Sequence, residues 1–136
     1  MTMSKTGSRA WTWLIWIVLA HLLISMVHGF AHAQANVPLS QAANLFVYLV
    51  ILAGPLLGLL LAWKARSAGS AVIAVAMAGS FVFGLVNHFV LSSPDHVAHV
   101  DPQWRALFAT TAVLLALTEA LGFGLAIRVV REAKTP

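Results

Sequence analysis

The sequence contains no cysteine and very little charge. Its 136 residues include 8 lysines and arginines and 4 aspartates and glutamates. The missing thiols exclude disulfides, thiolate metal sites, iron–sulfur clusters and cysteine nucleophiles. Charged residues make up 9% of the chain, compared with roughly 25% in an ordinary globular domain. So few charges cannot cover a water-soluble domain of this size, which argues against a cytosolic enzyme, a disordered tail and a nucleic-acid-binding module.

Common catalytic motifs are absent as well. The sequence has no G-x-S-x-G nucleophile motif, no H-E-x-x-H zinc motif and no glycine-rich phosphate loop. Whether the protein is an enzyme is therefore left open. A metal-dependent membrane enzyme stays an alternative, because an open metal position can activate water or oxygen.

What the sequence does contain is hydrophobic residues, which make up 60% of the chain and give a mean hydropathy of +0.89. A helix needs about 20 mostly apolar residues to cross the core of a bilayer. Four stretches reach that length, so we expect an all-α integral membrane protein with four transmembrane helices in one domain, a four-helix bundle. The expected spans are residues 11–32, 42–63, 71–91 and 103–127.

Short segments with turn-forming residues separate these spans, and we expect loops there. Pro55 lies near the middle of the second span and predicts a kink, because proline removes one helix hydrogen bond. Asp101 followed by Pro102 predicts the N-cap and first turn of the fourth helix. The expected outer loops are residues 33–41 and 92–102, and the expected inner loop is residues 64–70.

The basic residues predict the orientation of the bundle. All but Arg105 fall at one end of the spans, which the positive-inside rule identifies as cytoplasmic. Both termini are then cytoplasmic, in a bacterial-type inner membrane. The net charge of +4 thus reflects the membrane topology and does not indicate nucleic-acid binding. The expected partners are the lipid bilayer and either further copies of the chain or a larger membrane complex. The seven cytoplasmic bases are Lys5, Arg9, Lys64, Arg66, Arg128, Arg131 and Lys134.

The first span also resembles a secretory signal peptide. A basic start and an apolar stretch precede small-residue patterns at residues 31–33 and 33–35, as in a cleavage site. We favour a retained span, since the apolar stretch exceeds the usual 7–15 residues of such a signal and includes three tryptophans and a central histidine. Cleavage would remove His21 and His28.

Histidine is the most informative residue type. On the first span His21, His28 and His32 are spaced by seven and four residues, which places them on one helix face. His28 and His32, one turn apart, can converge on one ion. His88 lies at the same height on the third span, above a row of small residues typical of close helix packing.

The outer loop after the third span adds further candidate ligands at this height. Neutral imidazole suits zinc, copper and iron, and a carboxylate favours iron or zinc. We therefore expect a transition metal site at the outer face. Its candidate ligands are His28, His32, His88, His96, His99 and Asp95, with Asn44, Tyr48 and Asn87 as supporting polar groups.

A haem is the alternative cofactor for the same residues. His28 and His88 face each other from two helices at one height and could be the axial ligands of a b-type haem in an electron-transfer bundle. Only Arg105 is near enough in depth to pair with a propionate, which weakens this alternative.

Glu119 is the only acidic residue within a span. It lies close to the depth of His21, on a helix face lined by small residues, so the carboxyl should point into the bundle. An ionisable group at that depth is a functional hypothesis by default. A hydrogen bond between Glu119 and His21 would satisfy both groups, either as a proton relay or as a buried polar pair that fixes helix register.

The sequence thus favours a small membrane protein that captures, handles or transports a metal ion from the outer compartment, with proton coupling through His21 and Glu119. Two alternatives stay open. One is the haem bundle, and the other is an accessory subunit of a larger membrane complex with no catalytic role.

Overall fold

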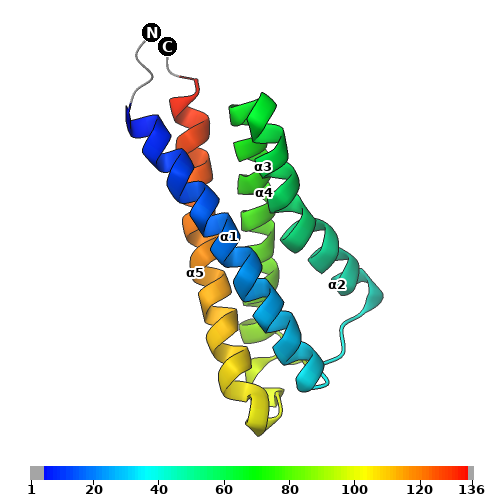
Figure 1. Ribbon diagram of the computed structural model, residues 1–136. Helices are drawn as coiled ribbons and strands as arrows, with labels where there is room; N and C mark the ends of the chain where they lie inside the picture. The colour runs from blue at the N-terminus through cyan, green and yellow to red at the C-terminus, as the bar shows by residue number, and fades with distance from the viewer. Residues whose placement is uncertain (1–4, 135–136) are drawn as a thin grey trace.

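Helices make up nearly all of the computed structural model, which describes residues 5–134 and contains no strand in that range. Figure 1 shows that α1 begins and α5 ends at one end of the bundle, which we call the inner end. The opposite, outer end holds the two longer loops. The elements are α1 (Lys5–Gln34), α2 (Gln41–Phe46), η1 (Val47–Ala53), α3 (Gly54–Lys64), α4 (Arg66–Leu85), η2 (Val86–Val90), η3 (Val97–His99) and α5 (Pro102–Glu132).

Four continuous helical segments are long and apolar enough to cross a membrane. This confirms the all-α prediction and the number of candidate spans, whereas insertion and the side on which the termini lie stay predictions. The first and fourth helices continue beyond the apolar stretches expected from the sequence, because helical hydrogen bonding does not end where hydrophobicity does. The segments are Arg9–Gln34, Gln41–Lys64, Arg66–Val90 and Pro102–Glu132.

Two helices, α2 and α5, begin at the outer end with side-chain caps. The Ser40 hydroxyl accepts a hydrogen bond from the Ala43 N–H at 3.1 Å, which starts α2. At α5 the Asp101 carboxylate accepts from the Gln103 N–H at 2.8 Å, and Pro102 occupies the first turn. This confirms the start of the fourth helix predicted from Asp101 and Pro102.

The prediction of an inner loop at residues 64–70 is wrong. Only Ala65, with φ −142° and ψ 84°, interrupts the helices, and α4 starts at Arg66. The reason is a very close approach of α3 and α4. A Cβ atom on Gly69 would overlap backbone atoms of Gly58 and Ala62, so glycine allows the two helices to meet directly after the turn.

The kink expected at Pro55 takes the form of a π-helical segment. η1 ends immediately before Gly54 and Pro55. Since proline has no N–H, the carbonyl of Ile51, four residues earlier, loses its usual helical partner. The wider π turn, with its i→i+5 bonds, accommodates this loss.

The four spans pack in an open order. α3 packs on α4, α4 on α5 and α5 on α1, whereas α1 makes few contacts with η1 and α3. In Figure 1 α2 diverges from α4 toward the outer end. The inner half is filled by a buried apolar cluster, which consists of Ala10, Leu14, Val18, Ile73, Ala74, Met77, Ala126 and Val129.

Candidate metal site

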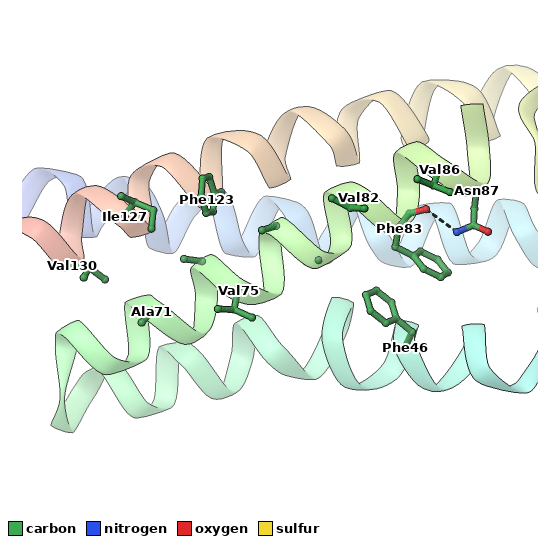
Figure 2. Close-up of a pocket in the computed structure, with 13 residues that line it drawn as sticks. Phe46, Ala71, Val75, Val82, Phe83, Val86, Asn87, Phe123, Ile127 and Val130 are labelled. Carbon is green, nitrogen blue, oxygen red and sulfur yellow. Dashed lines mark hydrogen bonds between the residues drawn. The ribbon is translucent and has the colours of Figure 1, made fainter. Parts of the chain in front are cut away.

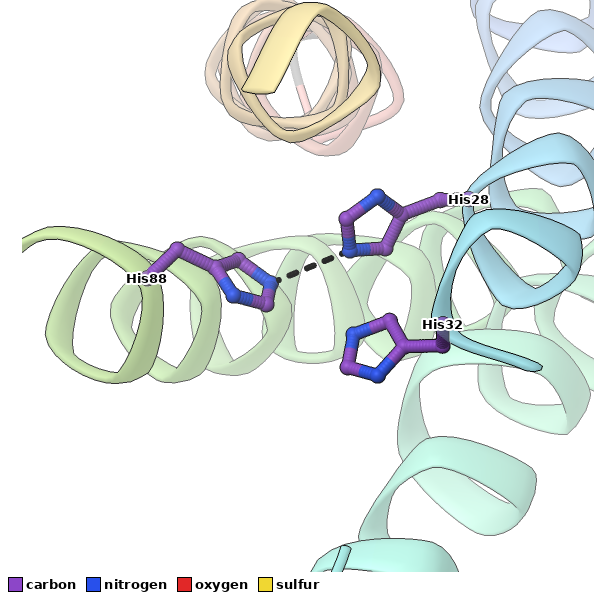
Figure 3. Close-up of side chains that lie close together, drawn as sticks. All are labelled: His28, His32 and His88. Carbon is purple, nitrogen blue, oxygen red and sulfur yellow. Dashed lines mark hydrogen bonds between the residues drawn. The ribbon is translucent and has the colours of Figure 1, made fainter. Parts of the chain in front are cut away.

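Three histidines from two spans converge in the outer half of the bundle. His28 and His32 come from α1 and His88 from η2, and Figure 3 shows their rings turned toward one another. One ring nitrogen from each lies within 4.8 Å of the other two. His28 and His88 are each only 6% exposed. These three histidines, together with Asp95, are called the outer cluster below.

Thr111 on α5 contacts one ring nitrogen of His28. The Thr111 hydroxyl lies 2.8 Å from the Leu107 carbonyl and 3.0 Å from the Phe108 carbonyl of its own helix. It also lies 2.8 Å from His28 Nδ1. When the hydroxyl donates to a carbonyl, it accepts from the His28 Nδ1–H, and a neutral His28 has its lone pair on Nε2. When it donates to Nδ1 instead, the His28 hydrogen is on Nε2.

The backbone of the outer loop determines which nitrogen of His88 carries the hydrogen. His88 Nδ1 lies 3.1 Å from the carbonyl oxygen of Asp95. A carbonyl oxygen only accepts hydrogen bonds, so Nδ1 carries the hydrogen and donates. A neutral His88 therefore has a lone pair on Nε2.

The two facing nitrogens of His28 and His88 lie close together. His28 Nε2 and His88 Nε2 are 3.2 Å apart. With the His28 hydrogen on Nε2 they form the hydrogen bond drawn in Figure 3, and with that hydrogen on Nδ1 two lone pairs face each other. Two ligand nitrogens of a tetrahedral zinc ion lie about 3.3 Å apart when each metal–nitrogen bond is about 2.0–2.1 Å. The separation thus suits a shared cation that takes the place of this hydrogen bond.

Asp95 completes the outer cluster with a buried carboxylate. Its Oδ1 lies 3.2 Å from His32 Nε2 and 3.2 Å from His88 Nδ1. Asp95 is 5% exposed, and Oδ1 has no hydrogen-bond partner in the described part of the chain. Because a buried charge is costly unless it is paired or bound to a metal, this oxygen favours a cation in the outer cluster.

An apolar cap covers the outer cluster. The Phe108 ring packs on all three imidazoles, with ring centroids 4.7 Å from His28, 4.7 Å from His32 and 5.2 Å from His88. Phe108 belongs to a buried group with Ala31 and Val100 at the outer end. The cap restricts the rotation of the rings and lowers the dielectric constant around them.

Several candidate residues are not brought to the outer cluster. His96 and His99 pack on each other in the outer loop with centroids 5.3 Å apart. The Ala98 N–H donates to His96 Nδ1, and the His99 ring donates to the Ser93 carbonyl, so these two rings instead stabilise the loop. Tyr48 is 62% exposed on the bundle surface.

The two candidate asparagines also bond to nearby backbone. Asn87 donates to the Phe83 carbonyl at 2.8 Å, one turn earlier in the same span. Asn44 donates to the Leu39 carbonyl at 3.4 Å, and its side chain lines an open groove described below. In the described part of the chain neither amide donates to a histidine of the outer cluster.

A haem does not fit between His28 and His88. The axial nitrogens on the two faces of a haem lie about 4 Å apart, twice a metal–imidazole bond length, with the macrocycle between them. Here the Nε2 atoms are 3.2 Å apart, and the two ring centroids are 4.9 Å apart in an edge-to-face contact. The cavity beside them has a volume of about 90 Å³, far smaller than a macrocycle.

His21 and Glu119 form a second polar site toward the middle of the bundle, which we call the inner pair. Both are buried, at 0% and 3% exposure. His21 Nδ1 and Glu119 Oε1 are 3.8 Å apart, which is too long for a direct hydrogen bond. The direct bond expected from the sequence is therefore not formed. His21 Nε2 instead donates to the Ile51 carbonyl at 3.2 Å, four residues before Pro55.

A narrow cavity of about 90 Å³ connects the outer cluster and the inner pair. Its walls include His28, His88 and Asp95 at one end and Glu119 at the other, with Ser25 and Ser80 between. Its lining comes from all four spans and from both outer loops. A second, open groove of about 390 Å³ shares Gly29, His32 and Leu39 with this cavity and is lined by Asn36 and Asn44 at the outer surface.

A larger depression is a different feature with different chemistry. Figure 2 shows it along α4, between the second span and α5, with a lining that is apolar apart from Asn87. The Phe46 and Phe83 rings stack at 4.7 Å across one end. Its volume is about 870 Å³. This apolar groove faces outward, and its lining includes no histidine.

No protein-family model, curated protein or solved structure matches the chain. Function is therefore inferred from the geometry of the outer cluster and the inner pair. The sequence does not single out Thr111, Phe108 or Ile51, which hold the imidazoles. The one indication of Thr111 in the sequence is its position two turns before Glu119, which places a polar residue on the same face of α5 as the buried carboxylate.

Proposed function

We propose that the protein binds a transition metal ion, zinc, copper or iron, within the outer half of a membrane-embedded bundle. The observation that carries this proposal is the convergence of three imidazole nitrogens within 4.8 Å of one another, two of which, His28 Nε2 and His88 Nε2, are 3.2 Å apart. The buried Asp95 carboxylate, 3.2 Å from His32 Nε2, is a second reason for a cation at the same place.

The proposed ligands are His28, His32, His88 and Asp95. His32 Nε2 points toward the other two rings in Figure 3 and lies 3.2 Å from Asp95 Oδ1, near the separation of adjacent ligands of one ion. Three imidazoles and a carboxylate are a donor set for zinc or iron, and the imidazoles alone can also bind copper. Thr111 and the Asp95 backbone would orient the two opposed rings as outer-shell partners.

The role we propose is capture, handling or transport of this ion from the outer compartment of a bacterial-type inner membrane. The open groove beside His32 is the route by which a hydrated ion would reach the outer cluster. The positive-inside distribution of bases supports cytoplasmic termini. His21 and Glu119 form the proton-binding part of the same proposal.

The second candidate is an accessory subunit of a larger membrane complex. The observation that favours it is the apolar groove of about 870 Å³ along α4, which is large enough to accept a helix or lipid chains from outside. This role is compatible with a metal site in the same chain.

The proposal is tested by metal analysis and zinc, copper and iron titrations of the detergent-purified protein. We expect about one ion per chain, and loss of binding in His88→Ala. The matched control is His99→Ala, which removes an exposed loop histidine and should bind like the wild type. Helicity and elution volume of each variant show whether it is folded. A metal-free wild type that binds none of the three ions would overturn the proposal, and a Soret band would replace it with haem.

A further inference from the structure

We propose that a divalent ion bound at the outer cluster exchanges for a proton held by the inner pair, and that the proton leaves through the cavity between them. This inference depends on the proposed metal site. It adds a stoichiometric exchange, in which occupancy of one site sets the protonation of the other.

The hydrogen bonds of the inner pair leave one position for a proton. His21 Nε2–H donates to the Ile51 carbonyl, so a neutral His21 has a lone pair on Nδ1. That lone pair faces the Glu119 carboxyl, 3.8 Å from Oε1, and Nδ1 has no hydrogen-bond partner in residues 5–134. A lone pair and a carboxylate side by side do not attract each other, so a proton on one of the two groups stabilises the metal-free pair.

No permanent cation is available to take the place of that proton. The titratable side chains lining the cavity are His28, His32 and His88, together with Asp95 and Glu119. The second span and α4 line the cavity opposite α5. Their lining residues are apolar apart from Ser80, whose hydroxyl donates to the Ala76 carbonyl. A bound metal ion would therefore be the positive charge that the described cavity otherwise lacks.

The charges balance when the ion is present. A divalent ion at the outer cluster would be matched by two buried carboxylates, Asp95 beside it and Glu119 at the far end of the same cavity. In the exchange the O–H bond of the Glu119 carboxyl, or the Nδ1–H bond of His21, breaks heterolytically and its proton passes to water. No electron is transferred, and the net charge of the buried region changes by one.

The cavity has the volume for a short water chain between the two sites. His21 and His28 are seven residues apart on α1, which corresponds to about 10 Å of helical rise. The cavity volume of about 90 Å³ accommodates roughly three waters at about 30 Å³ each. Three waters in a hydrogen-bonded row would span most of that distance.

The direction of proton movement follows from the packing on either side. Toward the inner end the buried apolar cluster around Ile73, Met77 and Val18 closes the bundle. Toward the outer end the cavity shares His32 and Gly29 with the open groove. A displaced proton therefore leaves to the same side from which the ion enters, which is an exchange at one face and not transport across the membrane.

The experiment counts protons released when zinc is added to the detergent-purified full chain in weakly buffered solution at neutral pH. We expect Glu119→Gln to release one proton fewer per bound zinc than the wild type, because glutamine has no proton to give up. The matched control is Glu132→Gln, the same change near the inner end of α5, where the carboxylate accepts from Arg128 at 2.8 Å. It should release as many protons as the wild type.

Equal proton counts for wild type and Glu119→Gln, with zinc bound by both, would overturn this inference and leave the metal site intact. Absence of zinc binding in the wild type would overturn both proposals. If Glu119→Gln does not fold, infrared difference spectra of the wild type decide the question. Zinc should remove the carbonyl stretch of a protonated carboxylic acid or the imidazolium signal of His21, and unchanged spectra in both regions would contradict the exchange.

Discussion

The inner and outer halves of the bundle differ in what fills them. In the inner half Leu14, Ile73 and Met77 are fully buried among other apolar side chains. In the outer half the equivalent space holds three imidazoles, two carboxyl groups and a cavity. The comparison indicates that the inner half supplies packing stability, whereas the outer half gives up packing for a polar site.

The polar groups of the outer cluster and the inner pair are only partly satisfied by the protein. The Ile51 carbonyl, the Thr111 hydroxyl and the Asp95 carbonyl each contact one imidazole. Among the described residues His21 Nδ1 has no hydrogen-bond partner, and Asp95 Oδ1 has only the ion-pair contacts of 3.2 Å to His32 and His88. Because unpaired buried polar atoms are destabilising, we expect a bound cation or proton to stabilise these groups.

The largest effect is expected where α3 and α4 meet in the inner half. Gly69→Leu would force a side chain into the backbone of Gly58 and Ala62 and should lower the free energy of unfolding by about 3 kcal/mol or more. The control is Gly124→Leu, since a Cβ at Gly124 meets nothing within 4 Å. Unfolding in mixed micelles with increasing SDS measures both. Equal stability of the two variants would contradict the distinction between a tightly packed inner half and its surface.

A smaller effect is expected at Thr111, which orients His28 in the outer half. Thr111→Val keeps the shape of the side chain but removes the hydroxyl, and should weaken zinc binding by about 10- to 100-fold while zinc still binds. Thr118→Val is the matched control, because the Thr118 hydroxyl also donates to two carbonyls of its own helix, at 3.0 Å each, and contacts no histidine. Competition with a zinc-binding dye measures the affinities. Similar affinities for Thr111→Val and the wild type would remove the argument for the His28 lone pair.

The smallest effect is expected from two buried serines of α4. Ser70 Oγ, in the inner half, has no hydrogen-bond partner in the described chain, so Ser70→Ala should raise the free energy of unfolding by about 1 kcal/mol. Ser80 Oγ donates to the Ala76 carbonyl and lines the cavity, so Ser80→Ala should change stability by less than about 0.5 kcal/mol. The same SDS titration compares them. A loss of stability in Ser70→Ala would show that the inner half depends on a polar contact there.

The number of helices, their approximate bounds and the start of α5 were all predictable. Long apolar stretches require helices in a bilayer, and Asp101 with Pro102 caps the fourth helix wherever that helix packs. The common height of His28 and His88 also follows from counting residues along each span. These properties depend on local sequence and on the fixed rise of a helix.

Other features depended on contacts between segments distant in the chain. The loop residue that reaches the outer cluster is Asp95, while His96 and His99 turn away because loop backbone groups occupy their rings. The short inner turn depends on Gly69 meeting Gly58 and Ala62. Neither outcome can be read from spacing, because loop conformation and helix separation are set by the packing of the whole bundle.

The sequence by itself determined an α-helical chain with four apolar segments, an excess of bases at one end and histidines toward the other. Only the tertiary structure decided which polar atoms meet and which residues contact each imidazole. Helical periodicity specifies the face of a residue on its own helix, but the rotation of each helix about its axis and its distance from its neighbours come from side-chain packing. The lone pairs of His28 and His88 therefore become a candidate metal site only when Thr111 and the Asp95 backbone are brought beside them.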